Sequence, residues 1–181
     1  MTEPITTTLN AIRAHSPCED GWADLLKHLG KTKADDEPLK FSTILESNGI
    51  EDALWCLRAL PEEHHDKIRH LAADYAERVL YLYEVKCPED KRPREAIQAA
   101  RDFADGKITI KELAAARAAA WAAAEDADRA ARAAAMAAAW AAEDADRAAE
   151  DAAEAAAWAA EDVAMYAERK IQGELLIKYF G

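Results

Sequence analysis

The sequence has few cysteines, and their arrangement suits neither a disulfide framework nor a zinc site. Cys18, Cys56 and Cys87 are the three cysteines among 181 residues. Their number is odd, and none belongs to a CxxC pair of the kind that structural zinc sites use. We therefore expect buried free thiols, which pack like small apolar side chains.

Sequence signatures of catalysis are missing as well. The chain contains no GxSxG, HExxH or dinucleotide-binding glycine pattern. Gly30, Lys31 and Thr32 resemble the end of a phosphate-binding loop, but Leu25 stands where that loop needs its first glycine. The sequence thus predicts no enzyme activity and no cofactor.

The histidines that lie close together lack the spacing of metal ligands. None of His64, His65 and His70 lies four residues from another, the spacing that directs two imidazoles at one ion. Asp66, His70 and Asp74 share a helix face at four-residue intervals, which could orient an imidazole for acid–base work. An exposed ladder of charges explains the pattern more simply, and we expect no metal site.

Basic residues and long apolar runs are scarce. The 23 Lys and Arg residues stand against 35 Asp and Glu, giving a formal net charge of -12 and a pI near 4.9. Binding to nucleic acid needs clustered cations, so basic partners are favoured and no nucleic acid is expected. Charges interrupt every alanine stretch well short of the roughly 20 apolar residues that cross a bilayer. Because Met1–Leu9 also lack the pattern of a secretory signal, a soluble cytoplasmic protein is predicted.

Helical periodicity is present throughout the chain. Hydrophobic residues make up 51% of the sequence, enough for one domain or a domain with a helical extension. Gly30 and Gly49 stand where helices would end, and Pro93 suits a first turn. No segment has the pattern of a strand. Apolar residues at three- and four-residue spacing predict helices over residues 5–14, 20–29, 42–47, 50–60, 64–86 and 93–105.

The helix expected over residues 64–86 has the clearest apolar stripe and should be the central core helix. The segment between Leu29 and Phe41 is polar and rich in loop formers, so we expect a surface loop there. Trp22 and Trp55 are assigned to the core. The apolar stripe of the central helix consists of Ile68, Leu71, Ala72, Tyr75, Val79, Leu82 and Tyr83.

The second half of the chain is helical by residue type. Thr109 and Glu112 form a capping box that starts a helix. No glycine or proline occurs between Lys107 and Gln172, and one helix of that length would be about 95 Å long. Helices of that size are rare, so a turn near an acidic cluster is slightly favoured over one rod. The expected architecture is all-α, with an N-terminal helical bundle over residues 1–106 and a long alanine-rich helix or helical hairpin over residues 107–181 packed on it.

Tryptophan recurs within an internal repeat. Three related segments place Trp121, Trp140 and Trp158 at equivalent positions after alanine triplets. Trp140 and Trp158 are separated by five helical turns, so on an uninterrupted helix they point the same way. Trp121 falls about 100° away on such a helix.

A helical projection of residues 141–157 separates an alanine sector from a charged sector that contains the tryptophans. Because alanine lets another helix approach closely, we assign its sector to packing within the chain or between protomers. The tryptophans then remain for recognition, the role that aromatic residues often have at interfaces. The alternative is that they pack on the first-half helices, or that the acidic clusters are turns. The predicted binding face comprises Trp121, Trp140, Trp158, Met136, Met165, Asp144, Asp151 and Arg147.

Negative charge is concentrated in this part of the sequence. Residues 125–162 hold eleven acidic residues against Arg129, Arg132 and Arg147. Such a surplus could imitate the charge of nucleic acid. A solvated helix face kept soluble by its charges is the simpler interpretation.

Several short segments of the first half form a specific set when they are taken together with the WAAA repeats. They are Pro17 and Cys18, Asp20–Trp22, Gly30–Thr32, Ala34–Leu39, Ser47–Gly49 and Ala53–Arg58. With the repeats they closely resemble a bacterial and phage family of immunity proteins, the immunity-five-like group, over nearly the whole chain. The resemblance implies a non-enzymatic helical protein that neutralises a toxin or, when a phage carries it, blunts a host defence system.

Two classes of function stay open at this point. The leading hypothesis is an inhibitor or immunity-type protein that binds a bacterial effector or defence protein through the acidic, tryptophan-bearing face. The second is a small-molecule sponge that sandwiches an aromatic ligand such as a signalling nucleotide, with Arg129, Arg132 or Arg147 on its phosphates. A conventional coiled-coil assembly is disfavoured because leucine heptads are missing. A homodimer is left open.

Overall fold

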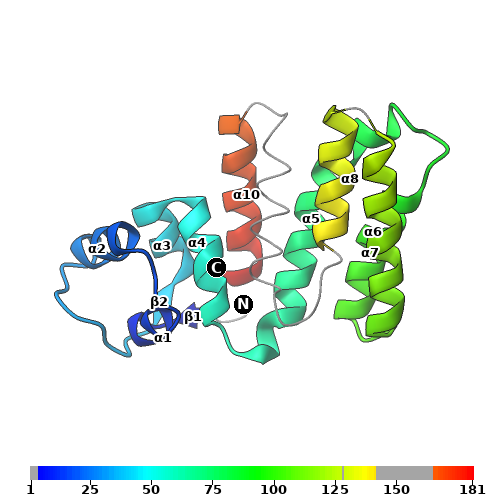
Figure 1. The fold of residues 1–181 in the computed structure, drawn as a ribbon. Coiled ribbons are helices and arrows are strands. Elements are labelled where there is room, and N and C mark those ends of the chain that lie inside the picture. Colours follow the sequence, from blue (N-terminus) through cyan, green and yellow to red (C-terminus); the bar gives the residue numbers. More distant parts are fainter. Residues whose placement is uncertain (1–3, 128, 142–164) are drawn as a thin grey trace.

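Helices dominate the computed structural model, which describes residues 4–127, 129–141 and 165–181. The all-α class is confirmed, with one short strand pair added (Figure 1). In chain order the elements are β1 (Thr6–Thr7), α1 (Leu9–Ala14), α2 (Glu19–His28), β2 (Leu39–Lys40), α3 (Phe41–Asn48), α4 (Ile50–Trp55), the 3-10 helices η1 (Cys56–Ala59) and η2 (Glu62–His64), α5 (His65–Glu84), α6 (Arg92–Ala104), α7 (Ile110–Glu125), α8 (Arg129–Ala141) and α10 (Met165–Phe180).

The strand pair lies in the N-terminal lobe, which we define as residues 5–60. β1 and β2 run antiparallel, with Thr6 opposite Lys40. The expectation of no strand was therefore wrong, because two-residue strands are too short to show alternation and their pairing joins distant segments. The same segment delays the first helix. The Thr8 hydroxyl accepts a hydrogen bond from the Ala11 amide, so α1 begins at Leu9 rather than at residue 5.

Helix ends in this lobe follow local residue chemistry. Gly49 ends α3 and precedes α4 with a φ of 85°, a left-handed conformation that favours glycine. The helix predicted over residues 50–60 is α4 followed by the 3-10 turn η1. The segment from Leu29 to Phe41 is the expected surface loop, with β2 at its end.

Trp22 and Trp55 do not belong to the fully buried core, contrary to expectation. Both are half-buried and pack against the edge of the core. Short helices cover an indole on one side more easily than on all sides, which is why tryptophan is seldom fully buried. The largest fully buried side chains of the lobe are aliphatic residues and Phe41.

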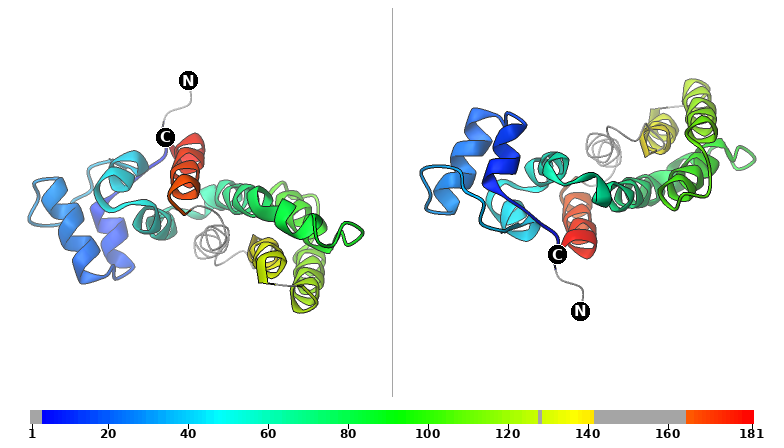
Figure 2. Two further views of the ribbon diagram at one scale, coloured as in Figure 1. Left: turned by 90° about the horizontal axis from the view of Figure 1, so that it is seen from above. Right: turned by 90° about the horizontal axis from the view of Figure 1, so that it is seen from below.

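The predicted central helix is confirmed as α5. It contacts α6, α8 and α10, and its apolar stripe is buried except for Leu82, which is half-buried. Helices α5, α6, α7 and α8 pack together as a bundle beside the N-terminal lobe (Figures 1 and 2). Thr109 and Glu112 form the expected capping box at the start of α7. A domain boundary at residue 106 stays a prediction.

Helix α10 lies between the lobe and the bundle and contacts α3, α4 and α5 (Figure 1). Arg78 of α5 donates two hydrogen bonds of 2.8 Å to Glu168, whose side chain is almost fully buried. The buried Tyr75 hydroxyl donates to the backbone carbonyl of Gln172 at 2.9 Å. These bonds fix the position of α10 along α5. No helix in the described ranges is long and apolar enough to span a bilayer.

Candidate functional site

A shallow groove of about 560 Å³ follows the hairpin that α7 and α8 form. We call it the tryptophan groove. Its lining residues are Arg117, Ala118, Trp121, Ala122, Glu125 and Trp140. Arg117, Trp121 and Glu125 are spaced four residues apart on α7, so they form one strip, and the exposed Ala118 and Ala122 lie beside it.

The hairpin brings the first two repeats into contact. The chain turns at the first acidic cluster, between Glu125 and Arg129. A turn near one of the acidic clusters was slightly favoured over a continuous rod. The rings of Trp121 and Trp140 pack edge to face, with centroids 5.8 Å apart and an interplanar angle of 72°. Such a pair contributes about 0.5–1.5 kcal/mol beyond its buried area. The angle of 100° expected on one helix does not apply, because the two residues lie on different helices.

Helix α8 is buried on nearly every side, which only small residues allow. Ala134, Ala137 and Ala138 have no exposed surface, and α5, α6 and α7 all pack against the helix. Between residues 131 and 141 the residues that are not fully buried are Arg132, Met136 and Trp140, spaced four apart. The tryptophan of α8 therefore lies on its one accessible strip, together with Met136.

Polar contacts hold the turn between the two helices. Arg132 donates a hydrogen bond from Nε to the carbonyl of Ala124 at 3.1 Å, which satisfies an acceptor in the last turn of α7. Arg92 of α6 lies 3.6 Å from the carboxylate of Asp126, the residue that ends α7. These two contacts connect the end of α7 to α6 and to α8.

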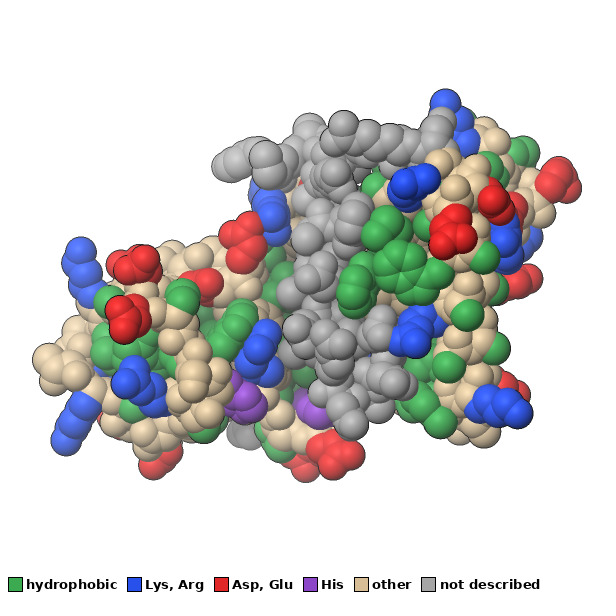
Figure 3. Space-filling view, viewed as in Figure 1, with side chains coloured by type: hydrophobic (Ala, Val, Ile, Leu, Met, Phe, Trp, Pro, Cys, Tyr) green, Lys and Arg blue, Asp and Glu red, His purple; other side chains and the backbone are tan. Residues whose placement is uncertain are grey.

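The groove has the character of a binding surface. Hydrophobic side chains gather over α7 and α8 in the space-filling view (Figure 3). Both tryptophans are half-buried, and the indole Nε1 of Trp140 is buried without a hydrogen-bond partner. A half-buried aromatic pair can accept an apolar or planar group from another molecule. The described ranges contain no group of three residues that could hold a metal ion.

The histidine ladder predicted on α5 has other partners. Nε2 of His70 lies 2.9 Å from Asp105, beyond the end of α6. The carboxylate of Asp74 accepts hydrogen bonds from Arg101 and from the hydroxyl of Tyr179. These contacts join α5 to α6 and α10, so the ladder ties helices together.

The structure describes part of the predicted binding face. It brings Trp121 and Trp140 together and places Met136 one turn before Trp140. Met165 begins α10, but its side chain is outside the described residues. The positions of four further predicted residues also lie outside the described ranges: Trp158, Asp144, Asp151 and Arg147.

Two features of the structure were not predicted from the sequence. Arg117 and Glu125 line the groove because they lie one turn either side of Trp121 on α7. Their spacing can be seen in the sequence, but a groove forms only because α8 packs beside them. A second cavity opens in the N-terminal lobe beside Trp22 and Trp55. Its signal was Gly21, a glycine inside a predicted helix, which often marks a close approach of another group.

The chain matches a known protein family. Residues 58–177 match the model of the family described as Imm-5 like putative immunity protein. This range includes the tryptophan groove. It begins at Arg58, which is the last residue of the short N-terminal segments that resemble the family. No curated protein and no solved structure matches the chain.

Proposed function

The chain belongs to the Imm-5 like putative immunity protein family, and we propose that it neutralises a bacterial effector or defence protein by direct, non-catalytic contact. The tryptophan groove is the contact surface in this proposal. The family match carries the immunity function, since it spans the bundle and the groove. The site of action is the cytoplasm of a bacterium or of a phage-infected cell.

The shape and composition of the groove support a protein partner. Interface hot spots are enriched in tryptophan and arginine, and they combine an aromatic anchor with a polar rim. The groove has this composition, with Trp121 and Trp140 between Arg117 at one end and Glu125 at the other. Its alanine floor leaves room for a side chain of the partner against the indole rings.

Charge supports a basic surface on that partner. The chain carries a formal net charge of -12, and residues 125–162 alone hold a surplus of eight acidic residues. A negative field of this kind speeds the encounter with a positively charged protein and weakens as salt is added. The association rate should therefore fall with ionic strength more than the dissociation rate rises.

A nucleotide sponge is the second candidate. The groove offers two indole rings that can stack on a base, and Arg117 is among its lining residues. Of the arginines named for this role from the sequence, Arg132 already bonds to the Ala124 carbonyl, and Arg147 lies outside the described ranges. The acidic surroundings weigh against an anionic ligand, so the protein partner is preferred.

The test is an affinity pull-down from bacterial lysate with tagged protein, followed by mass spectrometry of bound proteins and small molecules. An enriched effector is then purified and titrated against the wild type, Trp121→Ala and Trp140→Ala. Each variant should bind at least about 30-fold more weakly, because a hot-spot residue contributes about 2 kcal/mol or more. Circular dichroism verifies that both variants keep their helix content.

Tyr81→Ala is the matched control. Tyr81 is an aromatic residue of α5 with 53% of its surface exposed, and it does not line the groove. This variant should bind like the wild type. Equal affinity of the two tryptophan variants and the wild type would show that the groove is the wrong surface. Recovery of a nucleotide without any protein would favour the sponge.

A further inference from the structure

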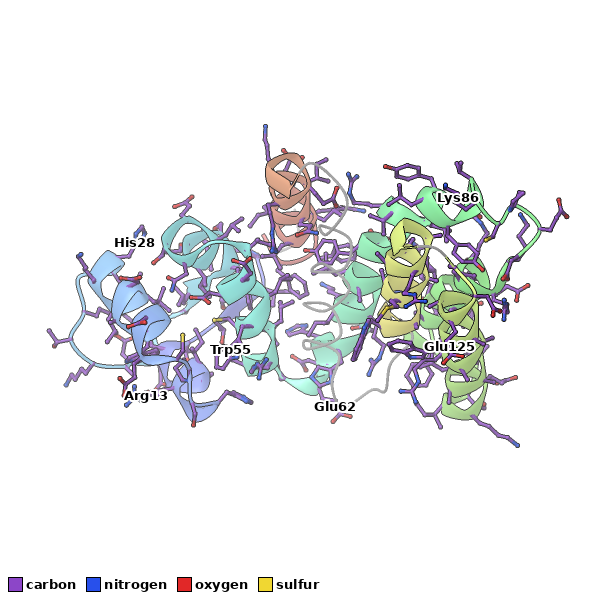
Figure 4. All side chains as sticks on the ribbon, turned by 45° about the horizontal axis from the view of Figure 1, so that its top comes forward. Arg13, His28, Trp55, Glu62, Lys86 and Glu125 are labelled. Carbon is purple, nitrogen blue, oxygen red and sulfur yellow. The ribbon has the colours of Figure 1, made fainter. Side chains whose placement is uncertain are left out.

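A cavity of about 140 Å³ lies in the N-terminal lobe, among α1, α2, α3 and α4. Its apolar walls include Trp22, Leu25, Ile44 and Trp55, and one edge is polar, with Asn48 and Asp52. Figure 4 shows Trp55 and Arg13 on this lobe. Every lining residue precedes Arg58, where the family match begins, so the cavity is a feature of this chain that the family match does not cover.

The polar edge contains an acceptor that lacks a donor. The Asn48 side chain donates from Nδ2 to the Gly21 carbonyl at 2.7 Å and to Oδ2 of Asp52 at 2.8 Å. These two bonds use both donors of the amide and fix its orientation, which leaves Oδ1 as an acceptor. This Oδ1 is buried and has no hydrogen-bond partner, which is a costly state for a polar atom.

Asp52 is the only charged side chain among the residues that line the cavity. The Cys56 thiol also lines the cavity. Its pKa is raised to about 12, first by burial and second by the Asp52 carboxylate. Arg13 and Arg58 lie outside the lining. They stack on the rings of Trp22 and Trp55 at 5.2 Å and 4.3 Å from the ring centroids, so they help to hold the two aromatic walls.

Gly21 of α2 lets α4 approach closely enough to form the polar edge of the cavity. A Cβ atom at this position would lie 2.6 Å from Oδ2 of Asp52 and 3.0 Å from the Cys18 sulfur. Glycine inside a helix costs about 1 kcal/mol relative to alanine. Here it allows the carboxylate to stand against the backbone of α2, within reach of Asn48.

We propose that this cavity binds an ammonium or guanidinium group carried on a short apolar stem. The cation would donate to Oδ1 of Asn48 and to the Asp52 carboxylate, and the stem would lie between the tryptophan and aliphatic walls. A neutral hydrocarbon would leave the buried acceptor unpaired, and an anion would be repelled by Asp52. A cavity of about 150 Å³ accepts a molecule the size of benzene, which suits the side chain of lysine or arginine or a small free amine.

The test uses n-butylamine, 1-butanol and butyrate at pH 7, three probes of similar size and different charge. Binding is followed by NMR through the indole N–H signals of Trp22 and Trp55, with the other tryptophans as internal references. The amine should shift these two signals saturably with a Kd on the order of 1–10 mM. The alcohol should bind at least about tenfold more weakly, and butyrate should not bind. Absence of a saturable shift with the amine, or equal binding of the three probes, would overturn the proposal.

Asp52→Asn separates the charge from the fold. The variant keeps a side-chain oxygen that can accept the hydrogen bond from Asn48. Because it lacks the negative charge, it should bind the amine at least about tenfold more weakly. Asp24→Asn removes the same charge from an exposed position of α2 that does not line the cavity, and it should bind like the wild type. Amine binding that is unchanged in Asp52→Asn would contradict the assignment.

A further arm identifies the source of the cation. Lysine capped at both ends binds at least as tightly as n-butylamine if the site takes a side chain of a polypeptide, and more weakly if it takes a free amine. The proposal is independent of the tryptophan groove, so Trp121→Ala should bind n-butylamine like the wild type. Failure of one proposal therefore leaves the other to its own test.

Discussion

Helix α8 packs against three other helices, and one substitution tests this packing directly. Ala138 has no exposed surface, and α8 is covered by α5, α6 and α7. Ala138→Leu adds an isopropyl group at this fully buried position. Overpacking of this kind costs about 1–3 kcal/mol, because side chains leave their rotamers or a helix moves outward. The complete burial of Ala134 and Ala137 beside it leaves little space for relaxation, so we expect a loss of about 2–3 kcal/mol.

Ala115→Leu is the matched control. Ala115 is exposed on α7, and leucine and alanine have similar helix propensities. This variant should therefore unfold with a free energy within about 0.5 kcal/mol of the wild type. Urea unfolding followed by circular dichroism measures both variants. If Ala138→Leu proves as stable as Ala115→Leu, the small size of the alanines in α8 does not determine how closely the bundle packs, and the inference that only small residues allow the burial of α8 is refuted.

Three further substitutions test the polar contacts. Arg78→Met leaves the buried Glu168 carboxylate without its ion pair and should lower the free energy of unfolding by about 3 kcal/mol, measured in urea; a loss below about 0.5 kcal/mol would contradict the role given to this pair. Thr109→Ala removes the hydroxyl of the capping box and should cost about 1 kcal/mol, with faster amide exchange at the start of α7; unchanged exchange there would argue against the cap. The pKa of Asp90 lies well below its usual value, chiefly because Arg92 donates hydrogen bonds to the carboxylate. The stability from this pair is present above the unfolded pKa near 3.9 and is lost as the pH falls through the folded value, so Asp90→Asn should lower stability by about 1 kcal/mol at pH 7 and flatten its decline between about pH 5 and pH 2. An acid decline as steep as that of the wild type would refute the assignment.

Helix ends were predictable because their causes are local. Gly49 ends α3, Pro93 stands in the first turn of α6, and Thr109 caps α7, as the residue types indicated. The apolar stripe of the central helix was likewise visible as a spacing of three and four residues. Each of these signals depends on a few neighbours along the chain, so a single sequence is enough to read them.

The candidate site was only partly predictable. Trp121, Trp140 and Met136 stood out in the repeat, but the meeting of the two indole rings depends on where the chain turns. No glycine or proline marks that turn, and the acidic cluster at residues 125–128 was one of several places where it could fall. The cavity beside Trp22 was missed, because half-burial of a tryptophan depends on which helices cover it.

The sequence by itself determined the helical class, the helix ends that a glycine, a proline or a capping box marks, and the small size of the residues that face the centre of the bundle. Only the tertiary structure decided which helices become neighbours. The ion pair of Arg78 with Glu168 and the edge-to-face contact of Trp121 with Trp140 join residues that are far apart in the chain. The periodicity of a helix specifies which of its faces is apolar but not which partner covers that face, because many helices present equally apolar surfaces. The choice among them depends on the packing of the whole chain.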